Sequence, residues 1–565
     1  MDSVVTNNIQ DSSIEIHNDS SSLPFLHLND EEHFGILRLK MKKTEIAKQP
    51  TFLHFTIDKS GSMNDCSSGT KKIEYVVQTF VNMVNYFANL EKEMYIQVNT
   101  FSDSVNTLVD CVQITKENVN EIAKIIRNIH PDGSTNIEAA LKSANKIMSD
   151  YSDNFPEHQI GHIFMTDGDP THGETSHTLL SSYVNESFPN IFVGFGEYHN
   201  VSLLRMLSDN KLADYQFVDN MEHTGLIYGE VIHQFMYPAL QHVELRSING
   251  ELYDWRNNIW TTSLFEPVIT SETEKIYHIK TTDSTNVAVE ICSSSELLDT
   301  AISIPDLLDM ETGEIVKNDL TKYAYRQKVQ ELLFSAKDER NFRGTEKVNF
   351  KMHLRDTFDN IRKYMRENEL MEDGLLKMLC DDIAIVYKSL NSNFTDIGNV
   401  GRIALARHSS QGRQQAYNLT PTSSGRDTST FVPPHTPRPN RLQRMHTANI
   451  YAPTQTEDPD YDESISNRNP MLSLRIPSDD DINEDTFEKY IRSGLVDIDT
   501  KVTVFRTLSE ESDEGRSSED SIENYIPSNN STTCFATPSA IQTMREVSQT
   551  YSDGSTTDFK FPNIK

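Results

Sequence analysis

The chain has 565 residues, a formal net charge of −32 at pH 7 and a pI of about 4.9. This length is enough for two or three domains, and an acidic surface repels duplex nucleic acid, so we expect no nucleic-acid partner. The five cysteines lie far apart without a Cys-x-x-Cys pair, which argues against a disulfide framework, a zinc ribbon or a RING finger. A secretory signal pattern and a run of about 18 apolar residues are both absent, which predicts a cytoplasmic chain without a membrane span.

The chain begins with a polar segment and one strand pattern. Residues 1–30 are rich in Ser, Asn and Asp and are predicted to form a disordered lead. The segment from His33 to Met41 then alternates apolar and polar residues, which is typical of a half-buried strand. Because this strand comes before the strands of the next domain, we expect segment 31–50 to join a different sheet.

Residues 51–236 alternate between strand and helix patterns. The expected strands lie near 51–57, 94–101, 104–110, 160–166, 190–195 and 214–218. The expected helices lie near 72–90, 116–128, 136–150, 175–186, 200–208 and 222–236. Such alternation predicts an α/β fold, with a doubly wound, mostly parallel sheet that is covered by helices on both faces.

Five oxygen-bearing side chains stand at the ends of these patterns. They are Asp58, Ser60, Ser62, Thr135 and Asp167. One apolar run leads into the first three, another leads into Asp167, and Thr135 opens a helical stretch. Loops at the carboxyl ends of the strands converge on one crevice of an open α/β sheet. Two carboxylates and three hydroxyls meeting there form a hard-oxygen site suited to Mg²⁺ or a similar divalent cation.

This arrangement resembles the von Willebrand factor A (vWA) family over residues 51–236. The metal-ion-dependent adhesion site (MIDAS) of that family has the pattern Asp-x-Ser-x-Ser, a distant Thr and a more distant Asp, and all five positions are filled here. Flanking residues also match, namely Gly61, Met63, segment 135–141 and Gly168. The resemblance implies a Rossmann-like sheet whose strand pair near 94–110 forms one antiparallel edge.

The resemblance also implies a mode of binding. In the family, the five MIDAS residues hold Mg²⁺ or Mn²⁺ and leave a coordination position open, which a Glu or Asp of a partner fills. We therefore expect a protein ligand with an exposed carboxylate, and recognition instead of turnover. Some family members hold a second cation with two adjacent acidic residues after the first loop. Here Asp65 matches the first of these and Cys66 replaces the second, so a second cation is not predicted.

The pattern changes after residue 236. Short strands separated by Asn-Gly and Asp-Ser turns predict an antiparallel β-sandwich over 237–300, which the strand in segment 31–50 joins. Helical spacing over 318–392 predicts a helical bundle or cap. Residues 395–565 lose periodicity, with arginines early and acidic clusters later, and are predicted to form a largely disordered tail.

Other chemistries fit the sequence less well. A hydrolase that uses Ser60 or Ser62 would need a Gly-x-Ser-x-Gly elbow, and an ATPase would need a P-loop; neither is present. We therefore expect no intrinsic enzyme activity. A zinc site is a further alternative, but its four histidines lack helical i, i+4 spacing. They are His158, His162, His172 and His177.

The sequence thus predicts an intracellular scaffold or adaptor that binds protein through a metal ion. An alternative stays open, in which the chain is a non-catalytic subunit of a larger machine. An ATPase-type or ubiquitin-ligase-type assembly would fit, with the tail recruiting further components.

Overall fold

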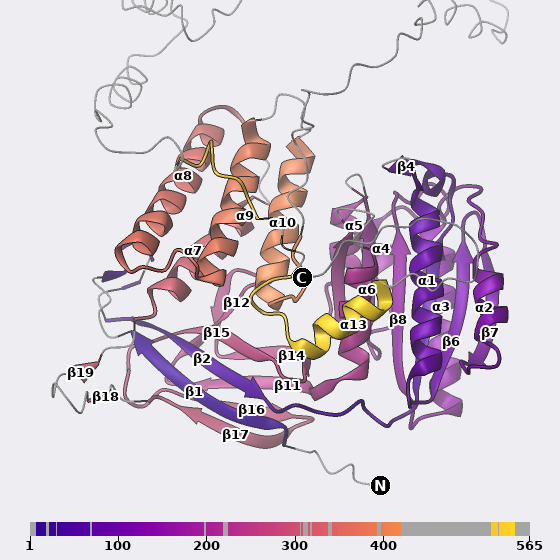
Figure 1. Cartoon of the computed structure of the whole chain (residues 1–565), viewed down its shortest axis with the longest axis horizontal. Coiled ribbons are helices and arrows are strands. Elements are labelled where there is room, and N and C mark those ends of the chain that lie inside the picture. The colour runs from indigo at the N-terminus through magenta and orange to yellow at the C-terminus, as the bar shows by residue number, and fades with distance from the viewer. Residues whose placement is uncertain are drawn as a thin grey trace, which may run out of the picture. The chain divides into compact units, whose positions relative to one another are not determined.

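A six-stranded mixed sheet forms the centre of residues 51–236 (Figure 1). Its strands, in order across the sheet, are β10 (Ala213–Val218), β9 (Asn190–Phe195), β8 (Gln159–Thr166), β3 (Thr51–Asp58), β6 (Met94–Phe101) and β7 (Val105–Gln113). Neighbouring strands run parallel except β6 and β7, which form the antiparallel edge. Every residue of β3 and β9 is buried, as expected of strands covered on both faces. The predicted mixed sheet is confirmed.

The computed structural model describes residues 7–419 and 521–548. Within these ranges it leaves out 18–21, 27, 30, 68–69, 197–198, 219–223, 305–306, 309–314, 317–318, 337–341, 392–396, 529 and 531. The described residues belong to one unit, residues 1–424 and 518–565, and the second unit, 425–517, lies outside them. Across these ranges, no helix has the length and apolarity that crossing a membrane requires.

Helices cover both faces of the central sheet. On one face, Phe80 of α1 (Lys72–Asn89) packs edge-on against Phe55, with 4.9 Å between ring centroids. On the other face, Tyr151 of α3 (Ile137–Asn154) stacks on Phe52 at 3.8 Å. Phe52 and Phe55 are an odd number of positions apart, so they point to opposite faces of the strand. The other helices are α2 (Val119–Ile126), α4 (His177–Ser181), α5 (Val201–Leu207) and α6 (Thr224–Met236).

Two antiparallel sheets form a separate sandwich. One sheet contains β1 (Ile9–His17), β2 (His33–Met41), β15 (Glu274–Thr281), β12 (Glu251–Asp254) and β13 (Ile259–Thr261). The other contains β14 (Ser263–Thr270), β11 (Pro238–Ile248), β16 (Ala288–Ser293) and β17 (Glu296–Ile302). The strand predicted in segment 31–50 is β2, and it pairs with β15 along its length. That segment therefore belongs to the sandwich. The described residues also contain two short strand pairs, β4 (Cys66–Ser67) with β5 (Thr70–Lys71) and β18 (Leu307–Leu308) with β19 (Ile315–Val316).

The predicted disordered lead is wrong for residues 9–17. This segment is strand β1, which pairs antiparallel with β2 at the edge of the sheet. Ile14 and Ile16 on it are fully or nearly fully buried. A half-buried strand needs apolar residues only at alternate positions, so the serines and aspartate of the segment obscured the two isoleucines that anchor it.

In the part of the chain that the structure describes, four helices follow the sandwich and a fifth comes near the C-terminus. Three of them match the predicted helical region, α7 (Thr321–Ser335), α8 (Gly344–Glu367) and α9 (Gly374–Asn391). The other two correct the predicted tail of 395–565, α10 (Ile397–Arg413) and α13 (Pro538–Ser548). Helix α10 was missed because it buries polar groups, as where Arg407 pairs with Asp382 at 2.6 Å. Most of the remaining tail, 420–520, lies outside the described residues.

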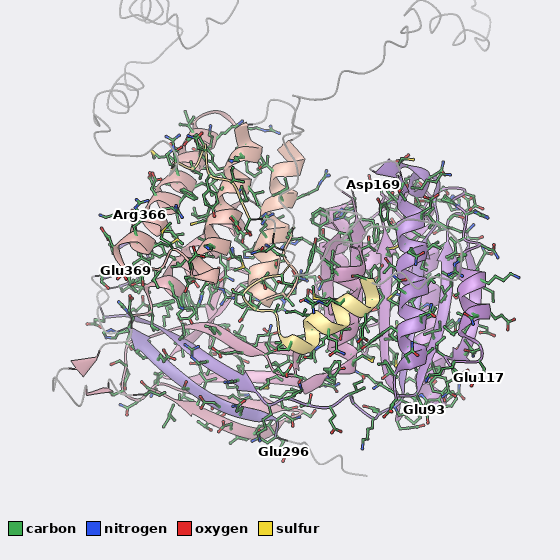
Figure 2. The ribbon with its side chains drawn as sticks, in the orientation of Figure 1. Glu93, Glu117, Asp169, Glu296, Arg366 and Glu369 are labelled. Carbon is green, nitrogen blue, oxygen red and sulfur yellow. The ribbon has the colours of Figure 1, made fainter. Side chains whose placement is uncertain are left out.

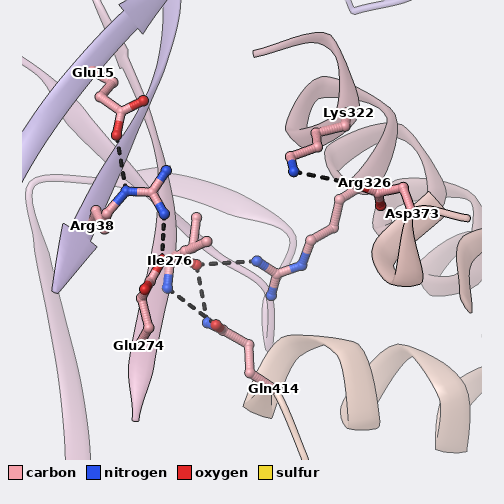
Figure 3. Close-up of polar contacts among 8 residues, drawn as sticks. All are labelled: Glu15, Arg38, Glu274, Ile276, Lys322, Arg326, Asp373 and Gln414. Carbon is pink, nitrogen blue, oxygen red and sulfur yellow. Dashed lines mark hydrogen bonds and ion pairs between the residues drawn. The ribbon is translucent and has the colours of Figure 1, made fainter. Parts of the chain in front are cut away.

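Polar side chains fasten the helices to the sandwich (Figure 3). Arg326 of α7 donates to the carbonyl of Ile276 on β15 at 3.1 Å. The amide of Gln414, just after α10, accepts from the Ile276 N–H at 3.1 Å and donates to its carbonyl at 3.0 Å. Gln414 thus satisfies both backbone groups of Ile276 as a neighbouring strand would, which fixes the end of α10 on the sandwich.

Candidate metal centre

The candidate metal site lies at the carboxyl end of the central sheet, where β3 and β8 stop side by side. The two strands pair in parallel from Thr51 and Gln159 to Ile57 and Met165, close to their carboxyl ends. This brings Asp58, the last residue of β3, next to Thr166 and Asp167 at the end of β8. The Thr166 hydroxyl donates a 2.6 Å hydrogen bond to Asp58 Oδ2. Parallel pairing therefore joins two residues that are more than a hundred positions apart.

The loop after β3 turns its hydroxyls toward the loop after β8. The backbone N–H of Ser60 donates to Asp58 Oδ1 at 2.7 Å, and one 3₁₀ turn, η2 (Gly61–Asn64), follows. Ser60 Oγ lies 3.1 Å from Ser62 Oγ, which donates to Asp167 Oδ1 at 2.7 Å. Four of the five predicted residues are thus linked in one chain of hydrogen bonds.

Thr135, the fifth predicted residue, comes from the loop before α3 and is buried. Its neighbour Asn136 caps the helix, because Asn136 Oδ1 accepts from the N–H of Ala139 at 3.0 Å. Two backbone contacts tie Thr135 to the loop after β8. Its N–H donates to Thr171 Oγ1 at 2.9 Å, and its carbonyl accepts from the Thr171 N–H at 3.0 Å. Because the side chain of Asn136 caps the helix, the hydroxyl of Thr135 is not needed as the cap.

Gly168 leaves a space where these loops meet. A Cβ added at Gly168 would lie 3.7 Å from Ser62 Oγ and 3.9 Å from Thr135 Oγ1. Both hydroxyls consequently face one point, beside the residue that follows Asp167. An added Cβ would make only ordinary van der Waals contact with both hydroxyls, so Gly168 marks the place where the loops after β3, before α3 and after β8 come together.

The site carries buried negative charge. Asp58 is fully buried, and this burial raises its pKa to about 6, with the nearby Asp167 carboxylate as a smaller cause. Lys72 at the start of α1 supplies one cation, because its Nζ lies 2.5 Å from Asp167 Oδ2. Two carboxylates against one ammonium leave an excess of one negative charge. Three hydroxyl oxygens, two carboxylates and this excess charge fit a hard divalent cation such as Mg²⁺ or Mn²⁺.

The surface around the site is exposed and acidic. Figure 2 labels Asp169, two residues beyond Asp167, at the end of the domain opposite to Glu93 and Glu117. Asp132, on the loop before α3, is also exposed and pairs with Lys59 at 2.5 Å. Asp169 thus presents an exposed carboxylate two residues from the site, whereas Lys59 balances the charge of Asp132.

The histidines near the third loop serve other purposes. His162 is buried in β8, where its ring contacts Thr56 Oγ1 at 2.9 Å and Asn190 Oδ1 at 2.8 Å. Burial lowers the pKa of His162 to about 4, which keeps it neutral in the core. The ring of His158 contacts the Tyr151 hydroxyl at 2.8 Å. Among the described residues, no three His, Cys, Asp or Glu side chains converge as a metal site.

Sequence reasoning missed two residues of the site, Lys72 and Thr171. Lys72 stands in a Lys-Lys pair at the start of the first helix, and a basic residue there is unusual, since the helix dipole favours acidic ones. A basic residue where an acidic one is expected could therefore have indicated that Lys72 has a partner outside its own helix. Thr171 follows Asp169-Pro170, and nothing in its pattern distinguishes it from a turn residue.

A family model described as the von Willebrand factor type A domain matches residues 53–169. This range contains all five candidate residues. The chain contains a vWA domain. Domains of this type mediate protein interactions and generally bind a divalent metal at the MIDAS.

The chain is also similar to inter-alpha-trypsin inhibitor heavy chains. Inter-alpha-trypsin inhibitor heavy chain 4 of Mus musculus is 33% identical over 165 residues, which cover 28% of this chain and 17% of that protein. Heavy chain H3 of Mus musculus is 30% identical over 224 residues, 37% of this chain and 24% of that protein. The chain thus spans about a quarter or less of these relatives. Among solved structures, a von Willebrand factor type A protein from Catenulispora acidiphila is 12% identical with a TM-score of 0.48, covering 72% of this chain and 97% of that one.

Proposed function

We propose that the chain is an intracellular scaffold or adaptor whose vWA domain binds a partner protein through a divalent cation. Asp58, Ser60, Ser62, Thr135 and Asp167 hold Mg²⁺ or Mn²⁺. An exposed Asp or Glu of the partner completes the coordination of the metal. The proposal assigns recognition and no catalysis to this site.

One observation carries the proposal: hydrogen bonds link Asp58, Ser60, Ser62 and Asp167 in one chain, and the hydroxyls of Ser62 and Thr135 both lie near Gly168. A buried carboxylate without a full counter-charge is costly, and a dication in that space would remove the cost. Two carboxylates only balance its charge. The ion therefore stays electrophilic toward a further carboxylate.

The acidic surroundings make this binding depend strictly on the metal. The exposed Asp169 beside the site repels a partner carboxylate, and the bound ion makes the spot where that carboxylate is favoured. Direct coordination occurs at a separation far below the Debye length of about 8–10 Å, so salt weakens it little.

The intracellular location is supported by the cysteines. Cys66, Cys111 and Cys534 are free and exposed, and Cys292 and Cys380 are free and buried. Exposed free thiols are typical of a reducing compartment.

Metal titration of the Asp58→Ala protein tests the site. Removing this carboxylate takes away a direct ligand and half of the balancing charge. We expect Mn²⁺ affinity, measured by calorimetry or by electron paramagnetic resonance, to fall more than about 100-fold, since even outer-shell partners contribute 10–100-fold. Asp169→Asn is the matched control, because it removes the same charge from the loop beside the site and should change affinity little. Undiminished Mn²⁺ affinity in Asp58→Ala would refute the assignment.

Partner capture tests the second half of the proposal. Proteins retained by the immobilised full-length chain should be lost with a chelator, return with Mg²⁺ or Mn²⁺, and be lost again with Thr135→Ala. Equal retention under all of these conditions would mean that another surface of the chain binds them.

A further inference from the structure

A cavity of about 310 Å³ lies between the vWA domain and the sandwich. On the vWA side it is lined by Ile160 and Ile191, the second residues of β8 and β9. These are the amino ends of the strands, so the cavity lies at the opposite end of the central sheet from the metal loops. On the sandwich side it is lined by Glu266 of β14 and Lys275 of β15.

The vWA side of the cavity is apolar and firmly packed. Phe235 of α6 rests on β8, because a Cβ added at Gly161 would lie 2.3 Å from its ring. The apolar lining is made by Ile160, Phe188, Ile191, Leu212, Phe235 and Val268. Pro156 and Ser187 also line the cavity and are exposed, so it opens to solvent. Its volume lies at the lower end of the range of small-molecule sites, about 300–1,000 Å³.

The sandwich contributes two opposite charges, one from each of its sheets. Lys275 lies two positions before Tyr277 on β15, and Tyr277 belongs to the core of the sandwich. Residues two positions apart share a face of a strand, so Lys275 points between the sheets. Glu266 of β14 lies directly opposite Val243, another core residue, and therefore points between the sheets as well. Both charges thus stand at the end of the sandwich that opens into the cavity.

Neither of these charges takes part in an ion pair. The Lys275 ammonium has three N–H donors, and within the described part of the chain only the carbonyl of Arg413 accepts from it. Burial lowers the pKa of Lys275, and the attraction of Glu266 opposes this shift. The Glu266 carboxylate forms no hydrogen bond and no ion pair with any residue that the structure describes. The two side chains therefore attract each other across the cavity, and each keeps contacts to offer to a ligand.

The other charged residues of the lining are engaged elsewhere. Arg413 and Asp214 form an ion pair with each other. The Arg256 guanidinium covers the ring of Trp255 at 4.6 Å. A ligand in the cavity thus meets an apolar wall on the vWA side and one charge of each sign on the sandwich side.

We infer that this cavity binds a free amino acid with a large apolar side chain. The α-carboxylate accepts from the Lys275 ammonium, and the α-ammonium donates to the Glu266 carboxylate, so both contacts are charge-assisted hydrogen bonds. The apolar side chain of the ligand lies against Phe188 and its neighbours. A simple acid would leave Glu266 enclosed without a partner and a simple amine would leave Lys275 so, which is costly. The small volume favours a single amino acid over a peptide.

Calorimetry on the full-length chain tests the inference, with L-phenylalanine and L-leucine as probes. Two analogues separate the charges, because 3-phenylpropanoate lacks the ammonium and 2-phenylethylamine lacks the carboxylate. L-Phenylalanine should bind roughly tenfold or more tightly than either analogue, as expected for one further charged hydrogen bond. A chelator should leave its affinity unchanged, because the cavity and the metal loops lie at opposite ends of the sheet. This result would hold even if the metal site failed its own test.

Two charge variants assign the contacts. Glu266→Gln and Lys275→Met should each weaken L-phenylalanine binding roughly ten- to a hundredfold. Glu266→Gln should not weaken 3-phenylpropanoate, and Lys275→Met should not weaken 2-phenylethylamine, whereas a misfolded variant would lose every ligand. Glu244→Gln and Lys40→Met are the matched controls. Glu244 pairs with Arg246 outside the cavity, and Lys40 is exposed on β2, so both should bind L-phenylalanine as the unmodified chain does.

A steric variant gives a second readout that reports location. Val268→Trp fills the cavity from β14 without changing a charge, and it should abolish binding of L-phenylalanine and of both analogues. Circular dichroism and urea unfolding check that this variant is folded. The inference would be overturned by absent binding of L-phenylalanine and L-leucine up to about 10 mM. Binding of 3-phenylpropanoate as tight as that of L-phenylalanine, or full binding by folded Val268→Trp, would overturn it equally.

Discussion

Replacing Gly229 by alanine should release the C-terminal helix α13 from the vWA domain. Helix α13 packs on α6 and α1, and it comes close to α6 at two glycines one turn apart. A Cβ at Gly229 would lie 2.5 Å from Met544 Cα, and one at Gly225 would lie 2.8 Å from Ser548 Oγ. Ordinary carbon contacts begin near 3.5 Å, so Gly229→Ala requires α13 to withdraw by about 1 Å.

The size of the effect follows from what this withdrawal disturbs. Met544 and Val547 of α13 are fully buried against the vWA domain. Overpacking of this kind costs about 1–3 kcal/mol. Alanine also favours the helix of α6 by about 1 kcal/mol, but that gain is present whether α13 is docked or free. Only the overpacking therefore shifts the equilibrium between docked and undocked α13. A cost of about 1–3 kcal/mol raises the undocked population roughly 5- to 150-fold.

Hydrogen exchange of the α13 amides measures this population directly. Exchange across residues 541–548 should accelerate by that factor in Gly229→Ala. Gly401→Ala is the matched control, because it makes the same change in α10 where the nearest atoms are 3.4 and 3.6 Å away. It should leave α13 protected. Unchanged protection in Gly229→Ala would refute the close packing of α13 on α6.

Two further predictions concern charge. Lys72→Met should raise the Mn²⁺ affinity of the vWA domain about tenfold, because the ammonium 2.5 Å from Asp167 competes with the metal for that carboxylate. Lys71→Met, which removes the exposed neighbouring charge, should leave the Mn²⁺ affinity unchanged. A lower Mn²⁺ affinity in Lys72→Met would contradict competition between the ammonium and the metal. Stability should fall as the pH drops from 6.5 toward 4, because burial lowers the pKa of His162, His199 and His233 to about 4 while the unfolded chain protonates near 6.5. Urea unfolding at several pH values measures this, and His162→Asn should reduce the pH slope by about one proton; an unchanged slope would contradict it.

The central sheet could be predicted from the sequence because each of its strands has a recognisable pattern of apolar residues within a few positions. β3 and β8 are rich in apolar residues; β3 ends in Asp58, and Asp167 follows β8 directly. The rule that such ends meet at one edge then brings Asp58 and Asp167 together without further information. Lys72 could not be placed in the same way, since its contact depends on the reach of a long side chain from the next helix.

The elements that escaped prediction depend on partners that are distant in sequence. Helix α13 has a short apolar stripe, Ala540, Met544 and Val547, and its complement is the glycine face of α6, some 310 residues earlier. Helix α10 buries Arg407, His408 and Gln411 beside the apolar Val400 and Ala404, and Asp382 binds two of these polar side chains, Arg407 and Gln411. Neither pattern identifies its partner until the fold is known.

The accessory elements attach to the vWA domain on sides that leave the metal loops uncovered. Arg413 binds Asp214 on β10, and Glu230 of α6 accepts the N–H of Ala416 at 2.8 Å. Helix α13 lies along α6 and α1, where Asn82 donates to the carbonyl of Val547 at 3.0 Å. Over the described residues, no hydrogen bond joins these later segments to the three loops of the site. Gly61 and Asp169 are exposed at that edge, as metal-dependent recognition of a partner there requires.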